Sequence, residues 1–189
     1  MVACEGNSIK RIDDARGRGS ARRLISSGIV ARMAAAARLI RLRLAARGRL
    51  EVRGHVQVAR GVRIAVARGA RVVLEDGCRL CESCRIEAIA GTVRIGPGAS
   101  IGERSVLVAH AGIDVGAGCV VGDWAVIADA EPTYDDADRP TRLQPLRVAP
   151  VRVGDGARIG LHATVAPGAT IAPGAVVEPY ETRAPRSSP

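Results

Sequence analysis

Branched apolar residues recur every six positions along most of this chain, and a small residue often follows them or stands two places before them. These apolar positions are Leu74, Leu80, Ile86, Ile95, Ile101, Leu107, Val115, Val121, Ile127, Val153, Ile159, Val165, Ile171 and Val177. A period of six differs from the period of about 3.6 in an amphipathic helix and of about 2 in a half-buried strand. It is typical of a parallel β-helix, in which each hexad supplies one short strand and one turn of a narrow prism.

The six-residue period is interrupted four times, and from the second interruption on these breaks lie three hexads apart. The excess is 4 residues before Leu74, 3 before Ile95, 2 before Val115 and 20 before Val153. Because three hexads make one coil, all four insertions are predicted to fall at the same corner of the prism. The longest insertion, residues 129–150, is polar and contains four prolines, so we expect an extruded loop there.

The pattern divides the chain into four parts. Residues 1–19 show no period and are predicted to be a disordered basic tail. Residues 20–48 are predicted to form a basic amphipathic helix. Residues 49–178 are predicted to form the all-β domain, a parallel β-helix that carries the loop. Residues 179–189 show no strand pattern and are expected to be a C-terminal tail.

The helix expected at residues 20–48 has two interpretations. One face collects Ile25, Ile29, Met33, Ala36 and Ile40. Arg32 and Arg38 interrupt every apolar run well short of the roughly 20 residues that a membrane span needs. The helix can cap the open end of the β-helix, which would otherwise present unpaired strand edges. It can also lie on an anionic membrane surface through residues 20–47; we prefer the cap.

The net charge of +9 is confined to the first part of the chain. Residues 1–50 hold 12 basic and 3 acidic side chains, whereas residues 51–189 hold 16 of each. The repeat region is therefore neutral, and the composition does not favour a nucleic-acid partner. With 47% hydrophobic residues, the 189-residue chain is long enough to bury a core of stacked aliphatic side chains without any phenylalanine.

Three cysteines, Cys78, Cys81 and Cys84, form a C-x-x-C-x-x-C run of the kind that binds metals or iron–sulfur clusters. The hexad register favours another interpretation. Cys78, Cys84 and Cys119 stand two residues before an inward aliphatic residue, and Cys81 stands one residue after Leu80. Both kinds of position usually hold small residues in the repeat. We therefore expect these cysteines to pack as small hydrophobic residues and expect no metal. Five cysteines, an odd number, and the lack of a secretory signal favour a reducing, cytoplasmic compartment.

The last coils and the loop before them resemble a known family. The segment PVRVGDGARIGLHATVAPG, residues 150–168, and the loop residues YDDADRP, residues 134–140, are similar to the hexapeptide-repeat acyltransferases, particularly to sugar O-acetyltransferases of the maltose and nodulation type. The resemblance covers about residues 52–178. It implies a left-handed β-helix, a homotrimer, and acetyl-CoA bound in the groove between neighbouring subunits, with the loop reaching toward the adjacent protomer.

The chain departs from this family at two positions. The family loop usually carries a histidine that deprotonates the acceptor hydroxyl, yet residues 129–134 read DAEPTY and contain none. The family also commonly has a tryptophan before the Ile-Gly of the following coil, where this chain has Arg158. The expected general base must therefore come from elsewhere.

His110 is the first candidate for that base, because a hydroxyl must lose its proton as it attacks a thioester and neutral imidazole suits this near pH 7. It lies in the two-residue insertion before Val115, one coil below the root of the loop. The run LVAHAG also resembles the Asp-His-Ala stretch of serine acetyltransferases, with Ala109 in place of the aspartate. Another carboxylate, Asp129 or Glu131, is then needed to orient the ring.

His162 is the alternative base, and it belongs to an outward register. One coil back in this register lies Trp124, then Arg104, and one coil forward lies Tyr180. This row is expected either to contact CoA or the acceptor, or to pack at the trimer interface, where arginine and aromatic residues are enriched. The third histidine, His55, projects outward from an irregular first coil and is expected to be solvated.

The remaining assignments combine these rows with the resemblance. Residues assigned to the acceptor are Arg104, Trp124, Asp129, Glu131 and Tyr134. Residues assigned to acetyl-CoA are Gly160, His162, Ala163 and Tyr180, with the Gly160 and Ala163 amides binding the thioester oxygen by resemblance. We expect acetyl transfer from acetyl-CoA to a hydroxyl of a sugar or polysaccharide precursor. The alternatives are a catalytically degenerate trimer that serves as a scaffold or CoA-binding module, and a nucleotide-sugar N-acetyltransferase.

Overall fold

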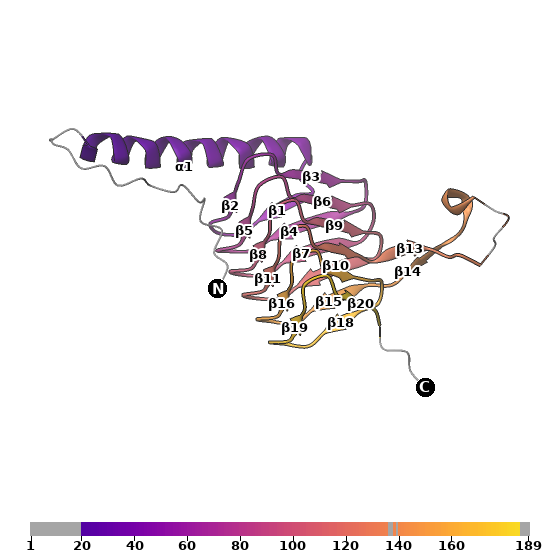
Figure 1. Cartoon of the computed structure of the whole chain (residues 1–189). Coiled ribbons are helices and arrows are strands. Elements are labelled where there is room, and N and C mark those ends of the chain that lie inside the picture. The colour runs from indigo at the N-terminus through magenta and orange to yellow at the C-terminus, as the bar shows by residue number, and fades with distance from the viewer. Residues whose placement is uncertain (1–19, 136–137, 139, 186–189) are drawn as a thin grey trace.

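The chain folds as a parallel β-solenoid with one helix across its N-terminal end (Figure 1). The structure is a computed structural model that describes residues 20–135, 138 and 140–185. The expected tail at residues 1–19 lies outside the described residues. The prediction of an all-β parallel β-helix is confirmed, since consecutive strands go in turn to three six-stranded sheets.

Each sheet is a stack of strands contributed by successive coils. Sheet A contains β1 (Leu50–Val52), β4 (Arg71–Leu74), β7 (Thr92–Ile95), β10 (Gly112–Val115), β15 (Val151–Val153) and β18 (Thr170–Ile171). Sheet B contains β2 (Gln57–Val58), β5 (Arg79–Leu80), β8 (Ser100–Ile101), β11 (Val120–Val121), β16 (Arg158–Ile159) and β19 (Val176–Val177). Sheet C contains β3 (Arg63–Val66), β6 (Arg85–Ala88), β9 (Val106–Ala109), β12 (Val126–Ala128), β17 (Thr164–Val165) and β20 (Thr182–Arg183).

The core is the column of hexad residues inside the prism. Ile101 of β8 pairs in register with Leu80 on one side and Val121 on the other, and these three side chains are at most 2% exposed. Each coil thus packs its aliphatic residue on that of the coil before it, and this stacking accounts for the six-residue period in the sequence.

The cysteines occupy small-residue positions in this column, as the register predicts. Cys78, Cys84 and Cys119 are fully buried, and Cys81 is 4% exposed. Burial, with a smaller effect of Asp76, raises the pKa of the Cys78 thiol to about 12, and burial alone raises that of Cys84 to about 12. Among the described residues no group of three or more His, Cys, Asp or Glu side chains is arranged to hold a metal ion.

All insertions lie at the corner between sheets C and A, as the spacing predicts. The longest one is more regular than expected, because β13 (Ala130–Pro132) and β14 (Leu146–Val148) pair as an antiparallel hairpin that projects from the stack (Figure 1). A short 3₁₀ helix, η1 (Thr141–Leu143), lies between them. The stack also continues past residue 178, since β20 pairs with β17 in a segment that shows no strand pattern in the sequence.

The helix α1 (Ser20–Ala45) contacts β1 and β2 and so covers the first coil. Leu39 and Leu42 pack against the core, and the guanidinium of Arg38 donates a hydrogen bond to the Val58 carbonyl at 3.3 Å. The packing face differs from the apolar face named from the sequence, of which Met33 is 67% and Ile40 56% exposed. No helix in the described part of the chain is long and apolar enough to cross a membrane.

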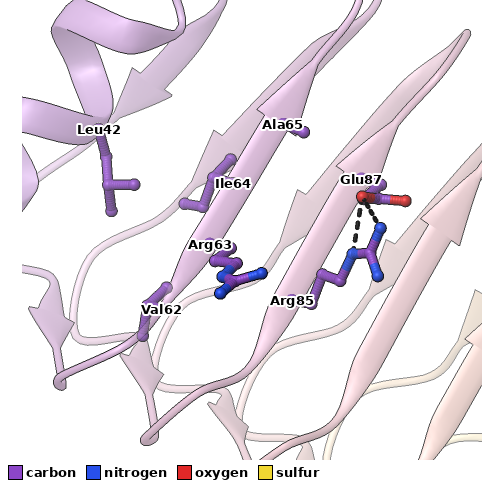
Figure 2. Close-up of a pocket in the computed structure, with 7 residues that line it drawn as sticks. All are labelled: Leu42, Val62, Arg63, Ile64, Ala65, Arg85 and Glu87. Carbon is purple, nitrogen blue, oxygen red and sulfur yellow. Dashed lines mark hydrogen bonds and ion pairs between the residues drawn. The ribbon is translucent and has the colours of Figure 1, made fainter.

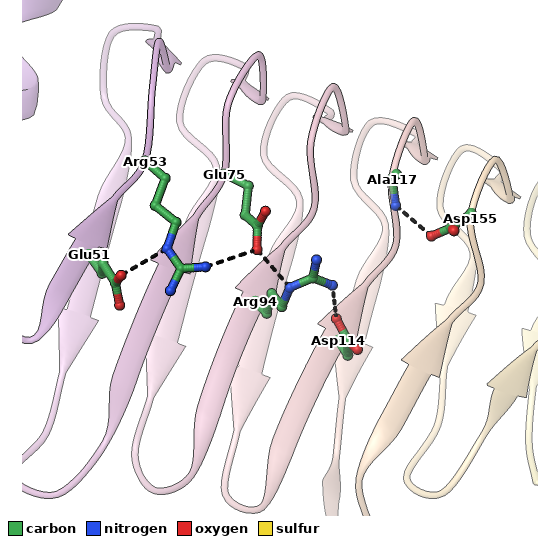
Figure 3. A network of polar contacts seen from close by, with 7 residues as sticks. All are labelled: Glu51, Arg53, Glu75, Arg94, Asp114, Ala117 and Asp155. Carbon is green, nitrogen blue, oxygen red and sulfur yellow. Dashed lines mark hydrogen bonds and ion pairs between the residues drawn. The ribbon is translucent and has the colours of Figure 1, made fainter.

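A row of ion pairs crosses the outer surface of sheet A from coil to coil (Figure 3). Arg53 contacts Glu51 and Glu75, and Arg94 contacts Glu75 and Asp114. The two carboxylates raise the pKa of Arg94. All of these side chains except Glu75, which is 17% exposed, are 40–58% exposed, so each pair contributes at most about 1 kcal/mol to stability.

Candidate active site

His110 lies in the tight turn between β9 and β10, at the same corner as the hairpin. Its side chain is 25% exposed, and its Nδ1 atom is buried without a hydrogen-bond partner. The nearest carboxylate oxygen is Oδ1 of Asp129, 3.8 Å from Nδ1. This distance exceeds a hydrogen bond, but it places a negative charge beside the ring and leaves Nε2 as the nitrogen available for chemistry.

Asp129 is fully buried, and its carboxylate holds the turn that carries His110. Oδ1 accepts a hydrogen bond from the backbone N–H of His110 at 2.6 Å. Oδ2 accepts from the N–H groups of Ala111 at 2.8 Å and of Gly112 at 2.6 Å. A buried carboxylate requires such donors, and three charge-assisted bonds to consecutive amides fix the backbone of the turn.

Aspartates cap amides of the preceding coil at other corners too, so capping by itself does not indicate catalysis. Asp76 accepts from His55 N–H, Asp123 from Glu103 N–H, and Asp155 from Ala117 N–H, the last shown in Figure 3. Each of these bonds involves one amide. Asp129 differs in accepting from three amides and in facing an imidazole.

The hairpin separates the two carboxylates that were candidates for orienting His110. Glu131 forms an ion pair with Arg147, opposite it on β14, whereas Asp129 lies beside the ring. Asp129 is therefore the carboxylate that the structure brings to His110. Tyr134, assigned to the acceptor from the sequence, is 73% exposed on the hairpin.

The predicted outward row forms a continuous stack at the corner between sheets B and C, which we call the aromatic ladder: Arg104, Trp124, His162 and Tyr180. The Arg104 guanidinium carbon lies 4.8 Å from the centroid of the Trp124 ring. The rings of Trp124 and His162 are 5.7 Å apart, and those of His162 and Tyr180 are 5.2 Å apart, nearly parallel in both cases. The four side chains thus share the outward register that the six-residue spacing predicts.

The backbone under the aromatic ladder is strained. All four ladder residues have φ between 53° and 63°, a left-handed conformation that costs residues other than glycine about 1 kcal/mol or more. At the corner between sheets A and B the corresponding positions are glycines, for example Gly98, Gly118 and Gly156. Bulky side chains therefore stand where glycine would relieve strain, and such strain points to a function for the side chains.

The sequence-based role of two backbone amides is not supported. The N–H of Gly160 donates to the Val177 carbonyl at 2.8 Å, and the N–H of Ala163 donates to the Gly160 carbonyl at 3.2 Å. Both amides are occupied by the stacking and turn hydrogen bonds of the solenoid. They are not free to bind a thioester oxygen, and the assignment of Gly160 and Ala163 as oxyanion donors is corrected accordingly.

Within one chain, His110 and the aromatic ladder lie at different corners of the prism. His110 follows a sheet C strand, while Trp124 and His162 precede sheet C strands, so the width of sheet C separates them. His55 is exposed on the first coil, as expected. The structure of the single chain therefore does not bring His110 and the aromatic ladder together.

A hollow lies on β3 and β6, the two strands that precede β9 in the sheet C stack. It has a volume of about 360 Å³ and lies between the end of α1 and sheet C (Figure 2). It is lined by Leu42, Val62, Arg63, Ile64, Ala65, Arg85 and Glu87. In Figure 2 Arg85 pairs with Glu87, and no candidate base is present, so this hollow is not the predicted active site.

Comparison with known proteins agrees with the fold and the resemblance. A protein of Mycobacterium tuberculosis named as a probable acetyltransferase is 30% identical over 125 residues, which are 66% of this chain and 41% of that protein. The chain thus spans about two fifths of the length of this relative. No family model matches the chain.

Solved structures with the same fold come from AntD, an N-acyltransferase from Bacillus cereus. One mutant of AntD, in complex with dTDP and coenzyme A, has a TM-score of 0.60 at 17% identity and matches 70% of this chain and 72% of that chain. Another, with the same ligands, has a TM-score of 0.52 at 16% identity and matches 70% and 73%. These similarities show that the chain shares the solenoid fold of this acyltransferase.

Proposed function

We propose that this protein is a CoA-dependent acyltransferase that moves an acetyl group from acetyl-CoA to a hydroxyl of a sugar or polysaccharide precursor. Three findings support the proposal: the hexapeptide-repeat solenoid, the similarity to a named acetyltransferase, and the shared fold with an acyltransferase solved with coenzyme A. The observation that carries it is the orientation of His110, whose buried Nδ1 faces Asp129.

The chemistry follows from this arrangement. Nε2 of His110 takes the proton of the acceptor hydroxyl as its oxygen attacks the thioester carbonyl carbon. The negative charge of Asp129 stabilises the imidazolium that forms, as an orienting carboxylate does in hydrolytic triads. The C–S bond then breaks, and the CoA thiolate leaves with the proton returned by His110. No step needs a metal or a further co-reactant.

The complete site is proposed to form between copies of the chain, in a homotrimer. The corner of the aromatic ladder is flanked by exposed apolar residues: Val120 is 40%, Val126 36% and Val176 51% exposed. Trp124 at 44% and Tyr180 at 71% add to this surface. An exposed apolar surface of this kind is suited to packing against a second copy of the chain. In this arrangement the aromatic ladder of one copy would lie opposite the His110 corner of its neighbour.

The test is release of the CoA thiol from acetyl-CoA in the presence of sugar acceptors. His110→Ala is expected to lower the rate by about 100- to 10,000-fold, the contribution of a general base. His55→Ala is the matched control, because His55 is exposed on the first coil, and its rate should equal that of the unaltered protein. Turnover that persists in His110→Ala would refute the assignment of the base.

A second candidate function is acylation of an amino sugar carried on a nucleotide. It is favoured by the neighbours, since AntD is an N-acyltransferase solved with dTDP and coenzyme A. A neutral amine attacks a thioester without prior loss of a proton, so this reaction depends less on a base. Comparing a dTDP-amino sugar with its hydroxyl counterpart decides between the two. No thiol release with either acceptor, from a protein that binds CoA, would instead support the degenerate trimeric module.

The localisation proposed with this activity is the cytoplasm, where an acetyl-CoA-dependent enzyme meets its donor. The buried thiols of Cys78, Cys84 and Cys119 are consistent with a reducing compartment. Fractionation of cells that produce the full-length protein tests this proposal, and recovery outside the cytoplasm and its membrane surface would contradict it.

A further inference from the structure

The helix α1 has an apolar face that nothing in the described part of the chain covers. Met33, Ile40 and Leu44 are spaced by seven and four residues and therefore lie on one side of the helix. They are 67%, 56% and 73% exposed. The packing side, with Leu39 and Leu42, is the opposite one. We call Met33, Ile40 and Leu44 the outer stripe.

The charged residues of the helix that carries the outer stripe are all basic. The sequence of α1 contains six arginines and no acidic residue. Arg41 and Arg43, each adjacent in sequence to a stripe residue, flank the stripe at about 100° per residue; Arg41 is exposed, whereas the Arg43 guanidinium donates a hydrogen bond to the Val52 carbonyl at 3.0 Å. An apolar stripe between arginines is the pattern of a helix that lies in the interface of an anionic membrane.

The first coils extend this basic surface around the helix. Residues 33–90 hold 12 arginines and 5 acidic residues, whereas residues 91–185 hold 8 arginines and 11 acidic residues. The charge is thus divided along the stack, positive at the helix end and negative at the other. On the first coil Arg60, Arg63 and Arg68 are exposed, and Arg63 and Leu42 of the helix line the same hollow (Figure 2).

We propose that the outer stripe and its arginines dock the helix end of the solenoid on an anionic lipid bilayer. The helix lies across the end of the stack (Figure 1), so the stripe faces away from the first coil and α1 lies flat in the interface. Arginines of the helix and first coil contact the lipid phosphates, and the acidic end of the stack points away from the membrane. This surface is separate from His110 and the aromatic ladder, so the proposal stands independently of the proposed function.

The test is co-sedimentation of the full-length protein with vesicles of phosphatidylcholine, alone or mixed with phosphatidylglycerol. Binding is expected only to the mixed vesicles and should weaken at high salt. The triple variant Met33→Ser, Ile40→Ser, Leu44→Ser should bind at least about 100-fold more weakly, because three apolar side chains no longer enter the interface. Arg41→Gln should weaken binding about fivefold.

A matched triple variant controls for the loss of exposed apolar side chains. Leu143→Ser, Leu146→Ser, Val148→Ser removes three residues that are 53%, 48% and 43% exposed on the projecting hairpin, and it should bind like the unaltered protein. The two triple variants should also keep the oligomeric state and melting profile of the unaltered protein, since both sets are exposed. Equal vesicle binding by the stripe variant, or equal binding to neutral vesicles, would overturn the proposal. Loss of the oligomer in the stripe variant would also overturn it, because the stripe would then face a second copy.

Discussion

Replacing Asp129 with asparagine isolates the role of the buried carboxylate beneath His110. The change preserves the size of the side chain but replaces one acceptor oxygen with an NH₂ group. In its best orientation the new amide side chain still accepts from two of the three backbone amides, those of Ala111 and Gly112. The backbone N–H of His110 then faces the NH₂ group, which is also a donor. The two remaining hydrogen bonds are no longer made to a charged acceptor.

The cost can be estimated from these contacts. One amide without an acceptor costs about 1–3 kcal/mol, and each bond that changes from charged to neutral loses about 0.5–1 kcal/mol. Asp129→Asn is therefore expected to lower the free energy of unfolding by about 2–5 kcal/mol. Asp155→Asn is the control, because that exposed carboxylate accepts from one amide only and asparagine keeps the bond, so about 0.5–1 kcal/mol is expected.

The assay is urea unfolding at one fixed protein concentration, since association of copies would make stability depend on concentration. The same variant should lose acetyl transfer under conditions where it is folded, because the turn no longer holds His110. If Asp129→Asn and Asp155→Asn differ in unfolding free energy by less than about 0.5 kcal/mol, the account of the turn is wrong.

Two further predictions concern the packing of the coils. A Cβ atom at Gly91 would collide with the carbonyl of Ala111 in the next coil, whereas one at Gly98 would meet nothing within 4 Å. Both have positive φ, so Gly98→Ala should cost about 1 kcal/mol and Gly91→Ala several kcal/mol in urea unfolding, and equal losses would contradict this. For Cys78 and Cys84 the folded-state pKa of about 12 lies above the ordinary 9.0, so the unfolded chain releases protons first. The free energy of unfolding should fall by about 1.4 kcal/mol per pH unit and thiol between those values, and an unchanged slope in Cys78→Ala, Cys84→Ala would refute this.

The β-helix could be predicted from the sequence because its core position repeats. Each coil stacks its aliphatic residue on that of the coil before it, as Leu80, Ile101 and Val121 show. Because one hexad supplies one side of the prism, these core positions recur every six residues in the sequence. Counting the insertions for the same reason placed His110 beneath the root of the hairpin. The order of the aromatic ladder followed from the same register.

Other features depend on contacts that the pattern does not record. The helix α1 is apolar on both sides, so its periodicity reveals the stripe of Met33 and Ile40 but not which side meets the first coil. Strand β20 has no inward aliphatic residue and exists because it pairs with β17. The N–H of Gly160 donates to a carbonyl of the next coil, a contact that the residue spacing does not reveal.

A crystal structure of the protein with acetyl-CoA tests the central claim most directly. The account predicts that the thioester sulfur lies next to Nε2 of His110 from one copy, with the rest of the cofactor along Trp124 and Tyr180 of a neighbouring copy. Binding of the whole cofactor to a single copy would contradict the site between subunits. A thioester directed at His162 would contradict the choice of His110 as the base.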